Sequence, residues 1–319
     1  MENKITGLHH VTSFASDPQR NLDFYAGILG LRMVKKTVNF DAPDIYHLYY
    51  GNEIGEPGTI LTFFPFQGAA TGRKGNGQVK VTSFSIPENS LEYWMRRLEK
   101  FNIGYHKPQQ HFDHETSLYF EDYDGMGIEL VANKTDTRPG FSYGQIPLEY
   151  AVKGFYGVTL GESNYEQTVS LLTGQMEHNL LFEKNNRFRF TTTDKPGSYV
   201  DIIHDPKEVR GLGGAGTVHH VAFATPDDGT QLEFREHLLT QGLVSPTPVL
   251  DRQYFHSIYF REPGGVLFEV ATSDIGFTID EPQDKLGELL KLPSWEEPNR
   301  TTIEKSLIPI EIKIDKYID

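Results

Sequence analysis

The 319-residue sequence predicts an α+β fold built from four βαβββ modules, and three observations carry this prediction. Four strand-like segments share one pattern, a helix-like stretch follows each of them, and every module ends in a strand led by glycine. The opening segments start roughly 60–80 residues apart, as repeated modules do. Because a single module leaves one sheet face exposed, modules should pair to complete their cores, and we expect two open-barrel domains.

The opening strands are rich in β-branched and aromatic residues, which favour strands. Two of them share the letters VTSF, and two contain a His-His pair before valine. The four segments are GLHHVTSFAS at 7–16, GQVKVTSFSI at 77–86, GFYGVTL at 154–160 and GTVHHVAFA at 216–224.

A helix should follow each opening strand, because a polar residue that can begin a helix precedes an apolar stretch in every module. The predicted starts are Asp17, Ser90, Asn164 and Thr230. Further strand-like runs come next, including YHLYY at 46–50 and SIYF at 257–260. The glycine-led closing strands are 58–64, 125–131, 197–203 and 265–271.

The chain divides into three predicted parts. The first pair of modules is placed in residues 1–140 and the second pair in residues 150–278. Residues 279–319 contain four prolines and many charges, and we expect them to form a C-terminal extension packed on the surface.

Composition excludes several classes of protein. The net charge of −14 disfavours binding to nucleic acid or to an anionic membrane. The absence of cysteine removes disulfides, thiolate nucleophiles and cysteine-ligated metals. No apolar run reaches the roughly 18–20 residues of a membrane helix, and the N-terminus lacks the apolar core of a signal peptide. A cytoplasmic protein is expected.

Histidines and carboxylates fall at equivalent positions of the modules. The residue before the shared valine of the opening strand is, in modules one to four, His10, Lys80, Gly157 and His220. The fourth residue after the leading glycine of the closing strand is Thr62, Glu129, Asp201 and Glu269. If modules one and four pair, His10, His220 and Glu269 converge inside one open-sided barrel.

Two imidazoles and one carboxylate form the facial triad of non-haem Fe(II) oxygenases, which leaves coordination positions open for substrate and dioxygen. Fe(II) is therefore the expected cofactor, although Mn(II) or another divalent metal suits the same ligands. Thr62 is a poor fourth ligand, and this disfavours Lewis-acid isomerisation. Modules two and three lack the histidines and are expected to be metal-free, with Glu129 and Asp201 bound by lysine or backbone donors.

The competing interpretation of His10 and His220 is that they are ordinary half-buried strand histidines. Their equivalent places in the repeat weigh against it. Because adjacent side chains of a strand face opposite sides, an error of one residue would replace them with His9 and His219. Glu269 lies in an apolar strand, where an unpaired carboxylate is costly and a metal would explain it.

The sequence resembles the vicinal oxygen chelate superfamily, which includes glyoxalases, bleomycin-resistance proteins and extradiol dioxygenases. It is most similar to the branch of hydroquinone (para-diol) ring-cleaving dioxygenases, over about residues 5–275. The segments that carry the resemblance are LHHVT at 8–12, FYAGILGLRMVKKTVNFD at 24–41, IYHLYYGNEIGEPGTILTFFPF at 45–66, VHHVAF at 218–223 and DRQYFHSIYFREPGGVLFE at 251–269.

The resemblance implies the vicinal oxygen chelate fold and the same three metal ligands, His10, His220 and Glu269. It also implies that five further residues line the pocket, namely His9, Thr12, His219, Arg252 and Tyr259. The expected partners are a small aromatic diol and dioxygen, and the sequence leaves a homo-oligomer open.

Each pocket residue has a functional and an ordinary interpretation. Tyr259 can hydrogen-bond a metal-held substrate oxygen, or be a core tyrosine. Arg252 can stabilise developing negative charge, or lie on the surface. His9, His219 and His256 are candidates for acid–base chemistry or for support of the ligands. Thr12 is the weakest candidate, since a strand threonine needs no functional reason.

A rival cluster lies in KPQQHFDHE at 107–115, where His111, Asp113, His114 and Glu115 are close together. Such a cluster can bind metal opportunistically, and a solvated loop is the favoured interpretation.

These observations predict an Fe(II)-dependent dioxygenase that cleaves hydroquinone-type rings in the detoxification of quinones and hydroquinones. The alternatives are a glyoxalase-like lyase or isomerase and a non-catalytic protein that sequesters an aromatic compound. The residues themselves do not separate hydroquinone from catechol, and the preference for hydroquinone comes from the resemblance.

Overall fold

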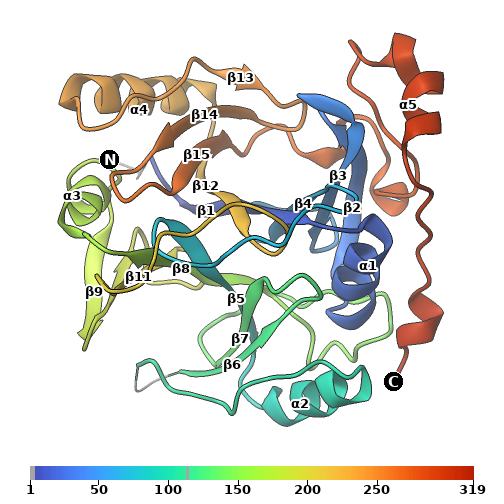
Figure 1. The fold of residues 1–319 in the computed structure, drawn as a ribbon, viewed down its shortest axis with the longest axis horizontal. Coiled ribbons are helices and arrows are strands. Elements are labelled where there is room, and N and C mark those ends of the chain that lie inside the picture. The colour runs from blue at the N-terminus through green and yellow to red at the C-terminus, as the bar shows by residue number, and fades with distance from the viewer. Residues whose placement is uncertain (1–3, 113–114) are drawn as a thin grey trace.

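The computed structural model describes residues 4–112 and 115–319, and it confirms the α+β fold of repeated modules (Figure 1). Fifteen strands form two mixed sheets in this part of the chain. Among the helices described, none is both long and apolar enough to cross a membrane.

The first sheet has eight strands in the order β13-β14-β15-β12-β1-β4-β3-β2. Its strands come from modules one and four, and their bounds are β1 (Gly7–Ala15), β2 (Arg32–Asn39), β3 (Ala42–Gly51), β4 (Ile60–Pro65), β12 (Val218–Thr225), β13 (Leu250–Asp251), β14 (His256–Arg261) and β15 (Leu267–Thr272).

The second sheet has seven strands in the order β6-β7-β5-β8-β11-β10-β9. Its strands come from modules two and three, and their bounds are β5 (Gln78–Pro87), β6 (Thr116–Glu121), β7 (Gly127–Asn133), β8 (Gly154–Glu162), β9 (Asn179–Lys184), β10 (Arg187–Thr191) and β11 (Tyr199–His204).

The sheets therefore join module one to module four and module two to module three. In each sheet two opening strands meet antiparallel, β1 with β12 and β5 with β8. Each opening strand also runs parallel to the closing strand of its own module, as β1 does with β4. Hydrogen bonding thus crosses the predicted division between residues 1–140 and 150–278, and these bounds remain a prediction about domains rather than a description of the sheets.

Each module places its helix after the opening strand. The helices are α1 (Pro18–Leu22), which continues as a π-helix over Asp23–Ile28, α2 (Leu91–Lys100), α3 (Glu166–Gly174) and α4 (Asp228–Gln241). Asp17 caps α1 by accepting a hydrogen bond from the Arg20 amide at 2.8 Å, as predicted. Helix α3 begins at Glu166 with Tyr165 at its cap, so Asn164 is not the capping residue.

Module two departs from the repeat. Among its described residues only the strands β6 and β7 follow the helix, and isolated bridges of Tyr105 with Phe120 and of Gln109 with Ser117 lie where the other modules have a further strand. The other three modules have the full βαβββ order.

The C-terminal extension runs along the side of module one (Figure 1) and contains α5 (Arg300–Ser306). It is anchored at both ends by ion pairs with cationic side chains that are almost fully buried. Lys35 lies 2.5 Å from the carboxylates of Asp280 and Glu281, and Arg97 binds Asp319 at 2.7 Å. The extension therefore belongs to the folded unit.

Candidate metal centre and active site

Three potential metal ligands stand on neighbouring strands of the first sheet. His10 lies on β1 and His220 on β12, while Glu269 lies on β15. The register places Ala222 of β12 between His10 and Glu269, so the two side chains flank it on the same face. One ligand atom from each of the three residues lies within 4.8 Å of the others.

The three side chains meet through atoms that carry lone pairs. The His10 Nε2 and His220 Nε2 atoms are 3.1 Å apart, and Glu269 Oε2 lies 3.3 and 2.8 Å from them. All three residues are at most 5% exposed. Yet Glu269 Oε2 accepts no hydrogen bond within the structure. A buried acceptor without a donor is costly, and a cation at the centre of the three atoms would satisfy it.

The charges at the cluster suit a divalent metal. Burial works to raise the pKa of Glu269, but the neighbouring imidazoles of His10 and His220 hold it well below its usual value, so the carboxylate is ionised. Burial lowers the pKa of His220, although the neighbouring Glu269 opposes this shift. One carboxylate and two neutral imidazoles are ligands that first-row divalent metals accept.

The first histidine of each His-His pair supports the second. His9 Nδ1 lies 2.9 Å from His10 Nδ1, and His219 Nδ1 lies 2.8 Å from His220 Nδ1. His9 Nε2 also lies 3.1 Å from the Thr272 carbonyl, so it donates there and its Nδ1 accepts from His10. This assignment leaves the Nε2 lone pair of His10 facing the cluster, as metal ligation requires.

A cavity of about 290 Å³ opens beside the cluster. His10 and His220 form part of its wall, and aromatic side chains form most of the rest, namely Phe14, Phe40, Phe64, Phe66, Phe255, His47, Tyr49, His219 and Tyr259. Flat apolar walls with a few polar groups fit a small aromatic ligand.

The structure brings three of the five predicted pocket residues to this cavity, namely Tyr259, Arg252 and His219. Tyr259 stands opposite Glu269 across the β14–β15 hairpin. Arg252 Nε donates to the Tyr259 hydroxyl at 3.2 Å, and Arg252 Nη1 lies 3.6 Å from Asp41. Burial raises the pKa of Tyr259, so its phenol keeps its proton.

The other candidates lie outside the cavity wall. His9 is behind His10, where its pKa falls to about 3 because of burial. Thr12 is fully buried and hydrogen-bonds Thr62 at 2.8 Å. His256 pairs with Asp228 at 2.6 Å and takes no part in the cluster.

Sequence reasoning missed His47 and Tyr49 of β3. The segment YHLYY looks like an ordinary core strand, and the phenylalanines of the pocket are similarly inconspicuous. A usable signal did exist, because His47 and Tyr49 are two residues apart and must share one face of the strand. Both line the cavity.

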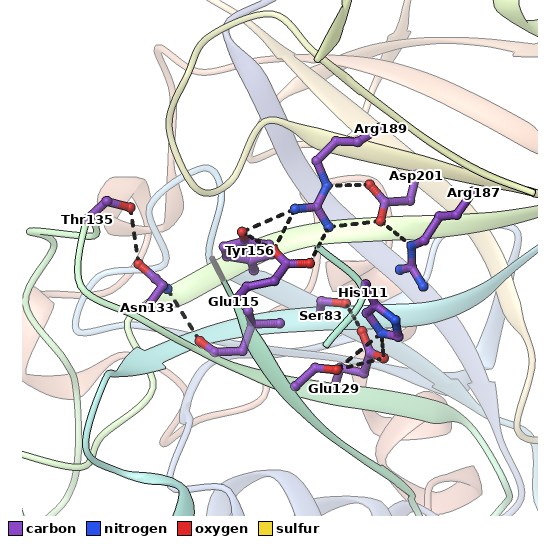
Figure 2. Close-up of polar contacts among 12 residues, drawn as sticks. Ser83, His111, Glu115, Glu129, Asn133, Thr135, Tyr156, Arg187, Arg189 and Asp201 are labelled. Carbon is purple, nitrogen blue, oxygen red and sulfur yellow. Dashed lines mark hydrogen bonds and ion pairs between the residues drawn. The ribbon is translucent and has the colours of Figure 1, made fainter. Parts of the chain in front are cut away.

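The equivalent carboxylates of the second sheet have protein partners (Figure 2). Glu129 lies 2.6 Å from His111 Nε2 and accepts from Ser83 at 3.0 Å. Asp201 binds the guanidinium groups of Arg187 and Arg189, each at 2.6 Å. Arginine, histidine and serine side chains thus bind these carboxylates, where lysine or backbone donors were expected, and Lys80 pairs with Glu208 instead.

The rival cluster at 107–115 is not simply a solvated loop. His111 binds Glu129, and Glu115 is 3% exposed and binds Arg189 at 2.6 Å. Asp113 and His114 lie outside the described residues. The two described acid and base groups of this cluster are used in the polar network of the second sheet.

Comparisons with known proteins agree with the fold. Residues 7–130 match the family model described as "Glyoxalase/Bleomycin resistance protein/Dioxygenase superfamily". The chain is 44% identical to "Putative ring-cleaving dioxygenase MhqO" of Bacillus subtilis (strain 168), over 98% of this chain and 99% of the relative. It is 34% identical to "Chlorohydroquinone/hydroquinone 1,2-dioxygenase" of Sphingobium indicum, over 91% of this chain and 92% of the relative.

Solved structures give the same result. A crystal structure of a putative dioxygenase from Bacillus subtilis superposes with a TM-score of 0.93 at 43% identity, covering 98% of this chain and 99% of the other. Glyoxalase I from Zea mays gives a TM-score of 0.60 at 13% identity, covering 84% of this chain and 92% of the other. The second likeness concerns the fold alone.

Proposed function

Because the chain belongs to the glyoxalase/bleomycin resistance protein/dioxygenase superfamily, we propose that it is an Fe(II)-dependent dioxygenase that opens the ring of hydroquinone-type substrates. The observation that carries the proposal is the buried cluster of His10, His220 and Glu269 at the wall of an aromatic cavity. Two imidazoles and one carboxylate are the ligand set of non-haem Fe(II) oxygenases.

His10, His220 and Glu269 would hold the metal, which when bound supplies a Lewis acid with positions for a substrate oxygen and for dioxygen. Among the chain's own groups, Tyr259 offers a phenol proton to an anionic oxygen near Glu269. Its own oxygen already accepts from Arg252, so the phenol proton is available. The Arg252 charge lies beside it and stabilises negative charge in the cavity.

The aromatic walls orient the ring and exclude water. Phe14, Phe64 and Phe255 surround the histidines, with the rings of Phe14 and His219 5.0 Å apart and those of Phe255 and His10 also 5.0 Å apart. A flat ring held between such walls lies in one orientation relative to the cluster, which raises the effective concentration of the reacting groups.

The preference for hydroquinones is taken from the Sphingobium indicum relative, whose name states that substrate class. Detoxification of hydroquinones and a cytoplasmic location are parts of the same proposal. Thr62 supports a dioxygenase over a glyoxalase-like isomerase. It stands at the place in module one that Glu269 has in module four, and its hydroxyl is engaged by Thr12 and His47.

The test is oxygen uptake by protein loaded with Fe(II) under anaerobic conditions and then offered a panel of hydroquinones and catechols. We expect one oxygen molecule consumed per ring opened, with hydroquinones as substrates. Stoichiometric iron binding without uptake on any diol would contradict the proposal. It would favour a lyase or a binding protein instead.

A further inference from the structure

His47 and Tyr49 form a wall of the cavity opposite Tyr259. Their strand β3 and the Tyr259 strand β14 are separated in the sheet by four strands, β15, β12, β1 and β4. Both side chains and Tyr259 nevertheless line the same cavity, so the sheet curves around it. A ligand in the cavity therefore lies between the two tyrosines, with the candidate metal ligands on the strands between them.

A chain of hydrogen bonds fixes Tyr49. Its hydroxyl lies 2.8 Å from His47 Nδ1, and His47 Nε2 lies 2.9 Å from Thr62 Oγ1. Thr62 in turn hydrogen-bonds Thr12 at 2.8 Å. Tyr49, Thr62 and Thr12 are at most 1% exposed, whereas His47 is half-buried at the cavity wall.

The tautomer of His47 sets the direction of this chain. Burial raises the pKa of Tyr49 well above its ordinary value, so the phenol is protonated. Burial lowers the pKa of His47 well below its ordinary value, so the imidazole is neutral. A neutral imidazole carries one N–H, and when this proton is on Nε2, His47 donates to Thr62 and Tyr49 donates its one proton to His47 Nδ1. The Tyr49 oxygen then has only acceptor capacity left for the cavity.

The two tyrosines thus differ in what they offer. Tyr259 accepts from Arg252 and has a proton to donate, which suits an oxygen that has lost its proton. With the His47 proton on Nε2, Tyr49 donates to His47 and has lone pairs to offer, which suits a hydroxyl that keeps its proton. A diol with one oxygen on the metal and one free hydroxyl matches both walls.

We propose that His47 carries its proton on Nε2 and accepts from Tyr49, and that Tyr49 in turn accepts a hydrogen bond from the substrate hydroxyl that the metal does not hold. This inference rests on the proposed function and deepens it, because it makes Tyr49 a residue that recognises a para-diol. His47 is a positioning residue, since it acts through Tyr49.

The experiment compares the binding of hydroquinone and of phenol to Zn(II)-loaded protein, by anaerobic titration calorimetry. Zinc occupies the same type of site without redox chemistry, and phenol lacks the second hydroxyl. The variants are Tyr49→Phe and, as a matched control, Tyr50→Phe. Tyr50 is equally buried on the same strand, and its hydroxyl donates to Asn21 at 3.0 Å, outside the cavity.

The ratio of hydroquinone to phenol affinity should fall about three- to tenfold in Tyr49→Phe, the usual worth of one neutral hydrogen bond. It should be unchanged in Tyr50→Phe. His47→Leu should lower the ratio as Tyr49→Phe does, whereas His47→Gln, which retains an acceptor for Tyr49, should restore part of it. Equal zinc content and thermal midpoint in the tyrosine variants would show that both remain folded.

An unchanged ratio in Tyr49→Phe would overturn the inference, and so would wild-type protein that binds hydroquinone no better than the twofold statistical advantage of its two hydroxyls. These outcomes are separate from failure of the proposed function. If hydroquinone is cleaved but the ratio does not change, only the inference fails. If the ratio falls as expected but Fe(II)-loaded protein consumes no oxygen, only the proposed function fails.

Discussion

The two sheets share one strand arrangement but differ in the side chains that occupy equivalent positions. In the sheet of modules one and four, Thr12, Thr62 and Tyr49 stand side by side in register, next to an aromatic cavity. In the sheet of modules two and three, the corresponding positions are Thr159, Asp201 and Arg189. The first set lies beside a cavity and the candidate metal cluster, whereas the second fills the equivalent region with charged side chains.

The difference lies in how the buried carboxylates are compensated. Asp201 has two guanidinium groups, and these hold its pKa below its ordinary value against the opposing effect of burial. Glu269 Oε2 receives no hydrogen bond from the residues that the structure describes. A carboxylate that the protein itself satisfies supports the fold, and one that the protein leaves unsatisfied is suited to a metal.

Removing one carboxylate from each sheet tests most directly whether the two sheets differ in metal binding. Glu269→Gln should weaken metal binding by more than the roughly 10–100-fold typical of losing a supporting residue, and ring cleavage should be lost with the metal. Glu129→Gln should leave metal content unchanged. Metal analysis after dialysis gives the measurement, and near-ultraviolet circular dichroism checks that both variants are folded. Equal metal loss in the two variants would contradict the contrast.

Arg189→Met tests the opposite sheet. The change leaves Glu115 and Asp201 buried without the guanidinium that binds both, so unfolding should cost about 3–5 kcal/mol less. Metal stoichiometry should stay the same, because no candidate ligand is touched. Urea denaturation measures the loss. A variant as stable as wild type would mean that the polar network of Figure 2 does not stabilise the fold.

His9→Phe tests the support behind the cluster. Losing the partner of His10 Nδ1 should weaken metal affinity by about 10–100-fold while the ligands remain. The control is His178→Phe, because His178 is also a buried histidine hydrogen-bonded to a carbonyl, that of Met176. Metal titration should separate the two variants, and similar affinities would show that His9 has no supporting role.

Glu162→Gln addresses the contact between the sheets and should have the smallest effect. Burial, with Glu262 nearby, raises the pKa of Glu162 to about 8, although Arg210 opposes the shift. A folded state that holds this proton more tightly than the unfolded chain is stabilised fully below about pH 4.5 and loses that stabilisation as the pH rises through 8. The unfolding midpoint should therefore fall less between pH 6 and pH 9 in the variant. Parallel pH profiles would contradict this.

Much of the fold and the candidate cluster was predictable because it depends on short-range patterns. The alternation of strand residues and the spacing from leading glycines place His10, His220 and Glu269 at equivalent points. The same alignment is wrong in module two. Ser83 pairs with Glu129 in module two as Ala222 pairs with Glu269 in module four. His220 stands two residues before Ala222, so the equivalent residue of module two is Val81 and not Lys80.

The shared letters VTSF cause that error, because aligning them matches Thr82 to Thr12, whereas Ser83 is the residue that stands beside Glu129 as Thr12 stands beside Thr62. Other features depend on contacts between distant segments. The partnership of Glu115 with Arg189 joins modules two and three, and the burial of Lys35 depends on the C-terminal extension. The place of Tyr49 in the cavity depends on the curvature of the sheet, which brings β3 to face β14. Sequence patterns of one module contain none of this information.

The most direct test of the contrast between the sheets is an anomalous difference map from crystals grown anaerobically with Mn(II). We predict one strong peak per chain, at about 2.0–2.2 Å from His10 Nε2, His220 Nε2 and a Glu269 oxygen. No peak should lie near Glu129 or Asp201. A peak beside those carboxylates, or none among the three predicted ligands, would contradict the assignment of the metal to the sheet of modules one and four.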